Sequence, residues 1–348
     1  MPRGFPDKWC PRKNTRRPAL LSRGILYGTD LARSGYHVNL ILTLTINPAI
    51  DRIITADRLV FEDRGYILDR AEAAGGRGIN ASQVIHSFGG KTTAILTAGG
   101  AAGERIEKLL GGLGFPYDLI HVRADSRTNL TISDKQGLTV KLNERGAPLE
   151  AGELKEIKKK VEARLPKAQW LMICGSIQPG VPPHFYCEIV EMAKSHGVKT
   201  VLDTDGEALQ HALEAKPTVI MPNQHEAERL LSRALITRGQ CLEAVDVMQA
   251  MGPECVILSL GARGAIGSSP EGVFEALPPR IEALSPIGAG DALGAAFAWS
   301  MEKKKSFSES LRWGVATGTG AAKLPGLAFP TFNDARAVYK QVELRQVK

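Results

Sequence analysis

The residues best suited to chemistry are Gly288, Ala289, Gly290 and Asp291, which begin a predicted apolar helix near the end of the chain. Two glycines before a helix start let backbone N–H groups converge on an anion, and the helix dipole favours negative charge there. A carboxylate beside an anion site repels its ligand. Asp291 therefore suits a general base that takes a proton from an attacking hydroxyl. The alternative is an aspartate that caps the first turn, which is the commoner role for Asp at a helix start.

Two earlier stretches could hold an oxygen-rich ligand. Gly75, Gly76, Arg77 and Asn80 precede a predicted helix over 81–86, and they offer backbone donors, a cation and an amide. Asp51 ends the stretch Asn-Pro-Ala-Ile-Asp after the first predicted strand, where a buried carboxylate could bind two sugar hydroxyls. Ordinary turn chemistry would also explain each stretch alone.

Charged groups follow two other predicted strands or turns. Arg127 begins a short strand-like stretch, where an arginine suits a phosphate at the rim of a site. Asn223 and Glu226 lie three residues apart after a predicted strand. This spacing is typical of a capping box, but it also suits water ligands of Mg²⁺, which takes few protein ligands directly.

A last stretch, with Ser259, Gly261 and Gly264, combines a strand end with a glycine turn that suits a nucleotide. Two familiar nucleotide sites are not indicated. The sequence after Gly288 approaches the dinucleotide fingerprint, but the region about 20 residues later is helix-like and not a strand ending in an acid. No Walker pattern of the P-loop type occurs.

These residues need a scaffold that brings strand ends together, and the chain has the pattern for one. The run at 38–45 predicts a buried strand that ends in a turn at Asn47 and Pro48. Short apolar strands then alternate with helices, which predicts an α/β fold with a mostly parallel sheet covered on both faces. The further expected strands are 92–97, 170–174, 200–203, 218–221 and 255–259, and the expected helices are 103–113, 183–196, 207–215, 224–235 and 291–301.

Two regions, about 52–72 and 127–142, depart from this rhythm. Their short alternation, with a turn-like segment at 134–137, predicts a small antiparallel sheet that projects from the main one. Such a sheet could be a lid over a site at the carboxyl ends of the parallel strands. It could equally be an edge hairpin that only packs.

The composition is that of a soluble globular protein: 348 residues, 43% of them hydrophobic and 23% charged. No stretch approaches the roughly 18 apolar residues of a membrane-spanning helix. Five cysteines form no Cys-x-x-Cys pair, which favours reduced thiols in a cytoplasmic protein.

The net charge of +7 comes almost entirely from the first 38 residues, which carry eight basic and two acidic residues. The other 310 carry 36 basic and 35 acidic residues, so no nucleic-acid-binding body is indicated. Residues 1–38 are predicted to be a disordered extension, and a transit peptide or a start codon assigned too far upstream are the alternatives.

Taken together, the stretches at 47–51, 75–80, 126–129, 222–226, 259–264 and 288–291 resemble the ribokinase-like (PfkB) carbohydrate kinases in type and order. The chain is similar to the branch of 1-phosphofructokinases, tagatose-6-phosphate kinases and minor 6-phosphofructokinases, which 175–180 and 202–209 also match. The resemblance covers about 39–345. It implies a ribokinase-like three-layer α/β/α fold with a small β-sheet lid, in a kinase domain over 39–348.

The implied activity is ATP-dependent phosphorylation of a ketohexose phosphate, with fructose 1-phosphate converted to fructose 1,6-bisphosphate. Fructose 6-phosphate, tagatose 6-phosphate, an unphosphorylated sugar or a nucleoside are alternative acceptors. A regulatory protein that binds sugar phosphate and ATP without turnover is the alternative outside enzymes. The resemblance also implies ATP and Mg²⁺ as cofactors and a cytoplasmic homodimer, with no nucleic-acid or membrane partner.

The resemblance further implies a role for each position. The expected catalytic residues are Gly288, Ala289, Gly290 and Asp291, with Asp291 as the base. The expected substrate-binding residues are Asp51, Arg64, Gly75, Gly76, Arg77, Asn80, Arg127 and Ser176, with the arginines on the substrate's phosphate. The expected nucleotide-binding residues are Asn223, Glu226, Ser259, Gly261 and Gly264, with Glu226 holding Mg²⁺ through water.

The chain departs from the family pattern at two charged positions. The third position of Gly-Gly-x-Gly is often Lys in relatives and is Arg77 here, which keeps the charge but changes its geometry. The residue before Pro222 is usually Lys and is Met221 here, which removes a possible phosphate contact.

Overall fold

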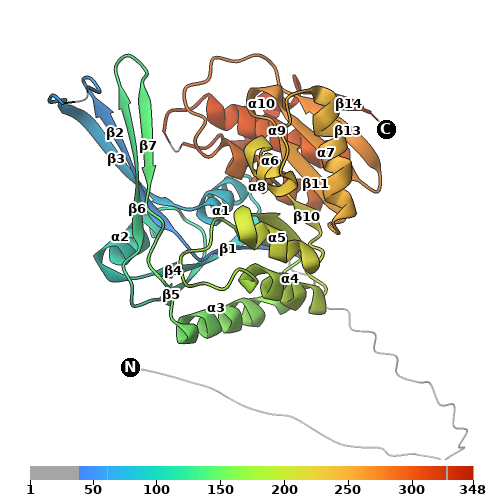
Figure 1. The fold of residues 1–348 in the computed structure, drawn as a ribbon, viewed down its shortest axis with the longest axis horizontal. Helices are drawn as coiled ribbons and strands as arrows, with labels where there is room; N and C mark the ends of the chain where they lie inside the picture. The colour runs from blue at the N-terminus through green and yellow to red at the C-terminus, as the bar shows by residue number, and fades with distance from the viewer. Residues whose placement is uncertain (1–38, 61, 327, 348) are drawn as a thin grey trace, which may run out of the picture. The chain divides into compact units, whose positions relative to one another are not determined.

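The computed structural model describes residues 39–347 except 61 and 327, and the extension predicted at 1–38 lies outside the described residues. The described residues form a ten-stranded sheet and a separate four-stranded sheet (Figure 1). The spatial order of the large sheet is β14 (Glu343–Gln346), β13 (Gly272–Leu277), β12 (Ala265–Ser269), β11 (Cys255–Ser259), β10 (Val219–Ile220), β9 (Lys199–Asp203), β8 (Trp170–Cys174), β1 (Leu40–Thr45), β4 (Lys91–Ala98) and β5 (Tyr117–His121).

Strands β11 to β5 in that order are parallel, and all of them except the edge strand β5 are largely buried on both faces. In β1, Ile41 packs on one side of the sheet, while Leu42 and Leu44 pack on the other, as the two-residue period of a strand requires. The face of Ile41 is covered by α1 (Arg77–Ser87), α8 (Ala289–Glu302), α9 (Phe307–Ala322) and α10 (Phe332–Tyr339). The face of Leu42 is covered by α3 (Ala151–Arg164), α4 (Phe185–Ser195), α5 (Gly206–Glu214), α6 (Gln224–Leu231) and α7 (Arg238–Ala250). The predicted three-layer fold is confirmed.

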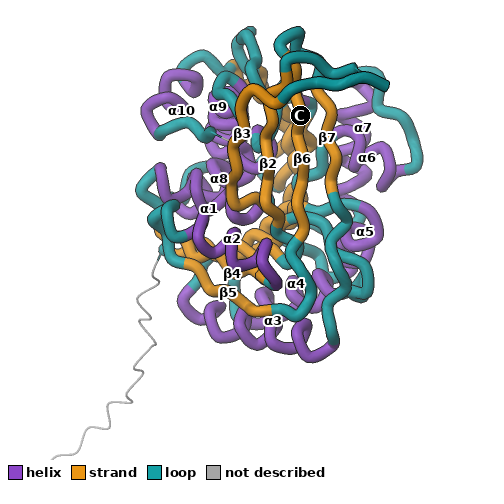
Figure 2. The backbone as a smooth tube through the Cα atoms, turned by 90° about the vertical axis from the view of Figure 1, so that its left-hand side faces the viewer, coloured by secondary structure: helices purple, strands orange, loops and turns teal. Residues whose placement is uncertain are grey.

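The four-stranded sheet, called the lid sheet from here on, has the order β3 (Ile67–Gly75), β2 (Ala49–Ala56), β6 (Arg127–Asp134) and β7 (Thr139–Asn143). Figure 2 shows these four strands side by side. The prediction that this small sheet is antiparallel is wrong at its centre, because β2 and β6 pair in parallel. Both follow strands of the large sheet, β1 and β5, so both leave its carboxyl edge in the same direction. Helix α2 (Gly100–Leu110) packs where the two sheets meet.

Two predicted helices end earlier than expected. The helix predicted at 103–113 is α2, which begins at Gly100 and stops at Leu110, before the paired glycines Gly111 and Gly112. The helix predicted at 224–235 is α6, which stops at Leu231 because Ser232 adopts a left-handed conformation with φ of 50°. The antiparallel edge β12–β13–β14 was not expected, since its short strands lack a long apolar run.

Candidate active site

Two adjoining cavities lie along the first turn of α8. The larger, of about 560 Å³, is enclosed by the lid sheet, by the carboxyl ends of the parallel strands and by the start of α8. The second, of about 480 Å³, lies on the far side of that turn. Ser259, Pro286, Gly290 and Leu293 line both cavities. Two ligands could therefore meet at the residues just before and within the first turn of α8.

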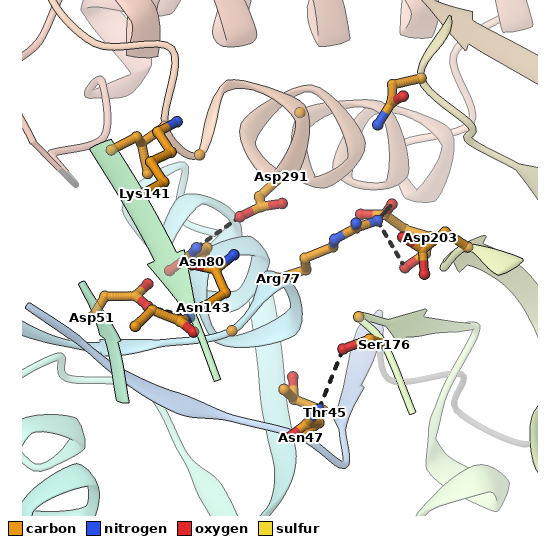
Figure 3. A pocket seen from close by; sticks show the side chains of 18 of the residues that line it. Thr45, Asn47, Asp51, Arg77, Asn80, Lys141, Asn143, Ser176, Asp203 and Asp291 are labelled. Carbon is orange, nitrogen blue, oxygen red and sulfur yellow. Dashed lines mark hydrogen bonds and ion pairs between the residues drawn. The ribbon is translucent and has the colours of Figure 1, made fainter. Parts of the chain in front are cut away.

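Asp291 is the third residue of α8, and its side chain points into the larger cavity (Figure 3). The N-cap of this helix is Gly288, with φ of 74°, and no side chain caps it. The Asp291 Oδ2 atom accepts a hydrogen bond of 2.7 Å from Asn80 Nδ2, a side chain of α1. Its hydrogen bond to a distant helix is not that of a capping residue. The alternative of a capping aspartate is therefore not what this geometry favours.

The electrostatics of Asp291 suit proton transfer. Burial and the nearby charge of Asp203 raise its pKa to about 6, although the hydrogen bond from Asn80 and the charge of Arg77 act in the opposite direction. A carboxylate with this pKa is ionised at neutral pH and is a stronger base than an ordinary aspartate.

At the opposite wall, a ladder of polar side chains crosses the lid sheet. Asp51 on β2 lies opposite Asn129 on β6, and Asn129 lies opposite Asn143 on β7. Asn129 Nδ2 donates to Asp51 Oδ1 over 2.8 Å. Burial raises the pKa of Asp51, against the effect of this hydrogen bond and of the charge of Arg127. Gly75 backs the carboxylate so closely that any Cβ there would overlap it.

Three cations line the larger cavity among the described residues: Arg77, Arg127 and Lys141. Arg127 donates to two backbone carbonyls, that of Asn47 over 3.2 Å and that of Glu144 over 2.8 Å. Burial lowers the pKa of Arg127, with the charge of Asp51 opposing. The backbone of Lys141 pairs with that of Thr131 on β6, but its ammonium group has no ion-pair or hydrogen-bond partner among the described residues. It is the cation in this cavity that is free to meet an anionic ligand.

Arg77, unlike Arg127 and Lys141, forms ion pairs with two carboxylates. Its Nη1 atom donates to Asp203 Oδ1 over 2.6 Å and its Nη2 atom to Glu226 Oε1 over 3.0 Å. These carboxylates hold the pKa of Arg77 well above its usual value, the charge of Asp203 having the larger effect. Glu226 also forms the predicted capping box, since its Oε2 atom accepts from the backbone N–H of Asn223 over 2.8 Å. Burial nevertheless raises the pKa of Glu226.

The larger cavity therefore brings together most of the predicted residues. They are Asp51, Gly76, Arg77, Asn80, Arg127, Ser176, Asn223, Glu226, Ser259, Gly288, Gly290 and Asp291. Arg64 is not among them: it is exposed in the turn between β2 and β3 and lines neither cavity. The second cavity is lined by three of the predicted residues, Gly261, Gly264 and Ala289. Most of its other lining is apolar, as at Pro278, Ile281 and Val315.

A model of the pfkB family of carbohydrate kinases matches residues 42–333 of this chain. The chain belongs to this family. It is 29% identical to ATP-dependent 6-phosphofructokinase isozyme 2 of Escherichia coli, over 86% of this chain and 97% of that one. It is also 29% identical to 1-phosphofructokinase of Borreliella burgdorferi (88% and 99%) and 27% identical to tagatose-6-phosphate kinase of Staphylococcus epidermidis (88% and 100%).

Solved structures of similar proteins have the same fold. Phosphofructokinase-2 from Escherichia coli, in complex with potassium, superposes with a TM-score of 0.82 at 28% identity, covering 86% of this chain and 98% of that one. Ribokinase from Arabidopsis thaliana, complexed with ribose and ATP, has a TM-score of 0.70 at 21% identity over 86% and 98%, which supports the fold alone. The predicted family, fold and enzyme class, a phosphotransferase with an alcohol acceptor, are confirmed. ATP is the phosphoryl donor that the family implies.

Sequence reasoning did not select Lys141 and Asn143 in this PfkB-family site. Both project from β7 into the cavity, two residues apart, in register with Thr131 and Asn129 on β6. Their polar alternation with Val140 and Leu142 is visible in the sequence. The sequence does not reveal that β6 pairs in parallel with β2. This pairing places Lys141 and Asn143 on the same face of the lid sheet as Asp51.

Gly264 closes one side of the second cavity, and we expect Gly264→Ala to destabilise the protein by about 3 kcal/mol or more. Its φ is +87°, and a Cβ there would overlap the carbonyl oxygen of Ala276 on β13. Urea unfolding measures the loss. The matched control is Gly197→Ala, with φ of +70° but open space around it, which should cost only about 1 kcal/mol. Equal losses in the two variants would contradict the steric argument.

The raised pKa of Asp291 predicts an acid limb in the pH profile. We expect log kcat/KM for the acceptor to be flat near neutral pH and to fall with a slope of about one per pH unit below about pH 6. The rate falls toward low pH because a general base works only when it is deprotonated, and lowering the pH protonates Asp291. Initial rates between about pH 5 and pH 8, with folding checked by circular dichroism, measure this limb. A profile that stays flat down to about pH 5 would contradict the assignment.

Proposed function

We propose that this PfkB-family protein transfers the γ-phosphoryl group of ATP to a hydroxyl of a ketohexose monophosphate, with fructose 1-phosphate as acceptor and fructose 1,6-bisphosphate as product. The observation that carries the proposal is the meeting of two cavities at Gly290, the residue before Asp291, whose side chain lines the larger of the two. The mostly apolar cavity suits the nucleotide, and the polar one suits the sugar phosphate. The curated relatives bear the names of kinases of fructose 6-phosphate, fructose 1-phosphate and tagatose 6-phosphate.

In the proposed mechanism, Asp291 takes the proton of the attacking hydroxyl. Asn80 holds the carboxylate in place by its 2.7 Å hydrogen bond to the Oδ2 atom of Asp291. The backbone N–H groups of Ala289, Gly290 and Asp291 at the start of α8 stabilise charge on the transferred phosphoryl group. Asp51 binds acceptor hydroxyls and so places one of them near Asp291. The lid sheet covers the acceptor and excludes water.

The residues present fit Mg²⁺ bound mainly through water and the nucleotide. Among the described residues no three Asp, Glu, His or Cys side chains are grouped so as to hold a metal directly. Asn223 and Glu226, with the neighbouring Asp203, offer the oxygen atoms that Mg²⁺ prefers. When bound with ATP, Mg²⁺ would neutralise charge on the phosphates.

We assign the phosphate already on the acceptor to Arg127 and Lys141. Both line the larger cavity, and neither is paired with a carboxylate among the described residues. A neutral sugar or nucleoside would need no such cations. Arg64 could reach a ligand only from outside this cavity, so its predicted role stays a prediction.

Replacement of Lys141 by Met tests this assignment. We expect KM for the sugar phosphate to rise about tenfold, with kcat and KM for ATP within about twofold, because an ammonium–phosphate contact is lost. Lys135→Met is the matched control, since that exposed lysine lies in the turn after β6 and lines neither cavity. An unchanged KM for the sugar phosphate in Lys141→Met would show that the phosphate binds elsewhere.

We also propose a homodimer formed through the outer face of the lid sheet. On this face Ile54, Ile132 and Val140 form an apolar row in register across β2, β6 and β7. Leu130 and Leu142 form a second apolar pair across β6 and β7, beside Arg52 on β2. Leu142 is 55% exposed, and such a row on an open sheet face favours pairing with an equal surface. Light scattering of the wild type and of Leu142→Glu tests the proposal. A monomeric wild type at working concentration would overturn it.

No helix in the part of the chain that the structure describes is long and apolar enough to cross a membrane. The cytoplasmic location stays a proposal that rests on the branch resemblance.

ADP release with a panel of acceptors tests the proposed function. The panel is fructose 1-phosphate, fructose 6-phosphate, tagatose 6-phosphate, fructose, ribose and adenosine. We expect turnover of ketohexose phosphates, with fructose 1-phosphate giving the highest kcat/KM. Higher kcat/KM for an unphosphorylated acceptor would overturn the proposal, and ATP binding without ADP release from any acceptor would favour a regulatory protein.

A further inference from the structure

Arg77 bridges two carboxylates that come from distant parts of the chain. It begins α1, and its guanidinium contacts Asp203 at the end of β9 (Figure 3) and also Glu226 in α6. The two carboxylate side chains are 13% and 3% exposed, and that of Arg77 is 30% exposed. These are short, largely buried contacts, which distinguishes them from surface ion pairs of little energetic weight.

The same carboxylates are the ones to which a divalent cation would be drawn. Asp203 and Glu226 are hard oxygen ligands, and Asp291 adds a third negative charge that acts on both Arg77 and Asp203. Met221, at the end of β10, lines the same cavity with an uncharged side chain. Among the described residues, Arg77 is the cation in contact with this pair of carboxylates.

We propose that the guanidinium of Arg77 occupies the place of a divalent cation between Asp203 and Glu226, so that metal and Arg77 compete for these two carboxylates. Binding of Mg²⁺ with ATP then exchanges partners. Asp203 and Glu226 would then hold the metal through its waters, and Arg77 would turn to the phosphate oxygens. The inference rests on the proposed function and deepens it, since it assigns Arg77 to the nucleotide's phosphates and not to the acceptor's.

The exchange has a consequence for metal binding without nucleotide. A metal ion alone would displace Arg77 without offering it a new anion, and a largely buried, unpaired guanidinium is costly. The triphosphate removes this cost, because it supplies charge-assisted acceptors in a geometry that guanidinium matches well. The nucleotide-free protein should therefore bind divalent cations weakly.

Titration of the nucleotide-free protein with Mn²⁺, followed by electron paramagnetic resonance of the free ion, tests the competition. We expect Arg77→Met to bind Mn²⁺ at least about tenfold more tightly than the wild type, since the carboxylates lose their counter-ion. The double variant Arg77→Met with Glu226→Gln should lose that gain. Lys141→Met removes a cation from the same cavity without touching these carboxylates, and its Mn²⁺ affinity should stay within about twofold of the wild type. Equal affinity in Arg77→Met and the wild type would overturn the proposal, as would an equal gain in Lys141→Met.

A measurement on the wild type covers the case in which Arg77→Met does not fold. The ¹⁵Nε–Hε signal of Arg77, assigned by its loss in Arg77→Lys, should stay in place with Mg²⁺ alone. It should move when Mg²⁺ and a non-hydrolysable ATP analogue are added together. Movement with Mg²⁺ alone, or none with both ligands, would overturn the exchange. Neither experiment contains an acceptor, so a failed acceptor panel and a failed exchange are separate results.

Discussion

Replacement of Asp291 by Asn is expected to lower kcat by about 10²–10⁴-fold while KM for ATP stays near its wild-type value. Asparagine keeps the shape of the side chain and can still accept the hydrogen bond from Asn80. It cannot take the proton of the attacking hydroxyl. Neutralising the carboxylate also removes a negative charge near the incoming phosphates, so ATP binding should not weaken.

The control is the same substitution at the same position of another helix. Asp334 is the third residue of α10 and forms a capping box with Thr331. Asp334→Asn should lower stability by about 1 kcal/mol or less and leave turnover unchanged. Thermal midpoints and kcat measured on the same preparations separate the two roles. If Asp291→Asn behaves like Asp334→Asn and turns over within tenfold of the wild type, Asp291 is not the base.

Replacement of Asp51 by Asn is expected to lower kcat/KM for the acceptor by roughly 10- to 10²-fold, with little change in KM for ATP. The variant keeps an oxygen that can accept from Asn129 and fits against Gly75. It loses the charge that strengthens hydrogen bonds from two sugar hydroxyls. Initial rates at varied acceptor and fixed ATP measure the effect.

Asp134→Asn is the control for the lid sheet. Asp134 is also buried, at the far end of β6, where it accepts from the backbone N–H groups of Gln136 and Leu138. Its loss should lower the thermal midpoint and leave kcat/KM for the acceptor unchanged. A similar fall in kcat/KM in both variants would mean that Asp51 acts only by holding the lid sheet together.

The elements that local sequence predicts best are those whose boundaries are set locally. The strands Trp170–Cys174 and Cys255–Ser259 were predicted with their observed bounds, because each is a short buried apolar run between turn residues. The direction of the β2–β6 pair could not be predicted in this way. It depends on where two segments about 80 residues apart leave the large sheet, which no local pattern encodes.

The site residues differ in the same way: some can be recognised from local sequence, and others are brought together only by the fold. The residues of the Gly-rich stretches were found because they lie close together in the sequence, as Gly288 and Asp291 do. The partners of Arg77 were not found, since Asp203 and Glu226 are 126 and 149 residues away and no local pattern joins them. Charge and residue type predicted Arg77 as a site residue, and the fold shows which carboxylates it contacts.

The polar ladder of the lid sheet has an evolutionary consequence. The lid-sheet side chains that we propose for the acceptor come from alternate positions of β2, β6 and β7, whereas the second cavity is built from β11, the loop after β13, α8 and α9. Substitutions at Ile53, Thr131 or Lys141 can therefore change which sugar is accepted without altering the donor side. We therefore expect substrate preference to diverge mainly through these three short strands, and directed evolution aimed at a new sugar can begin with a library on that one face.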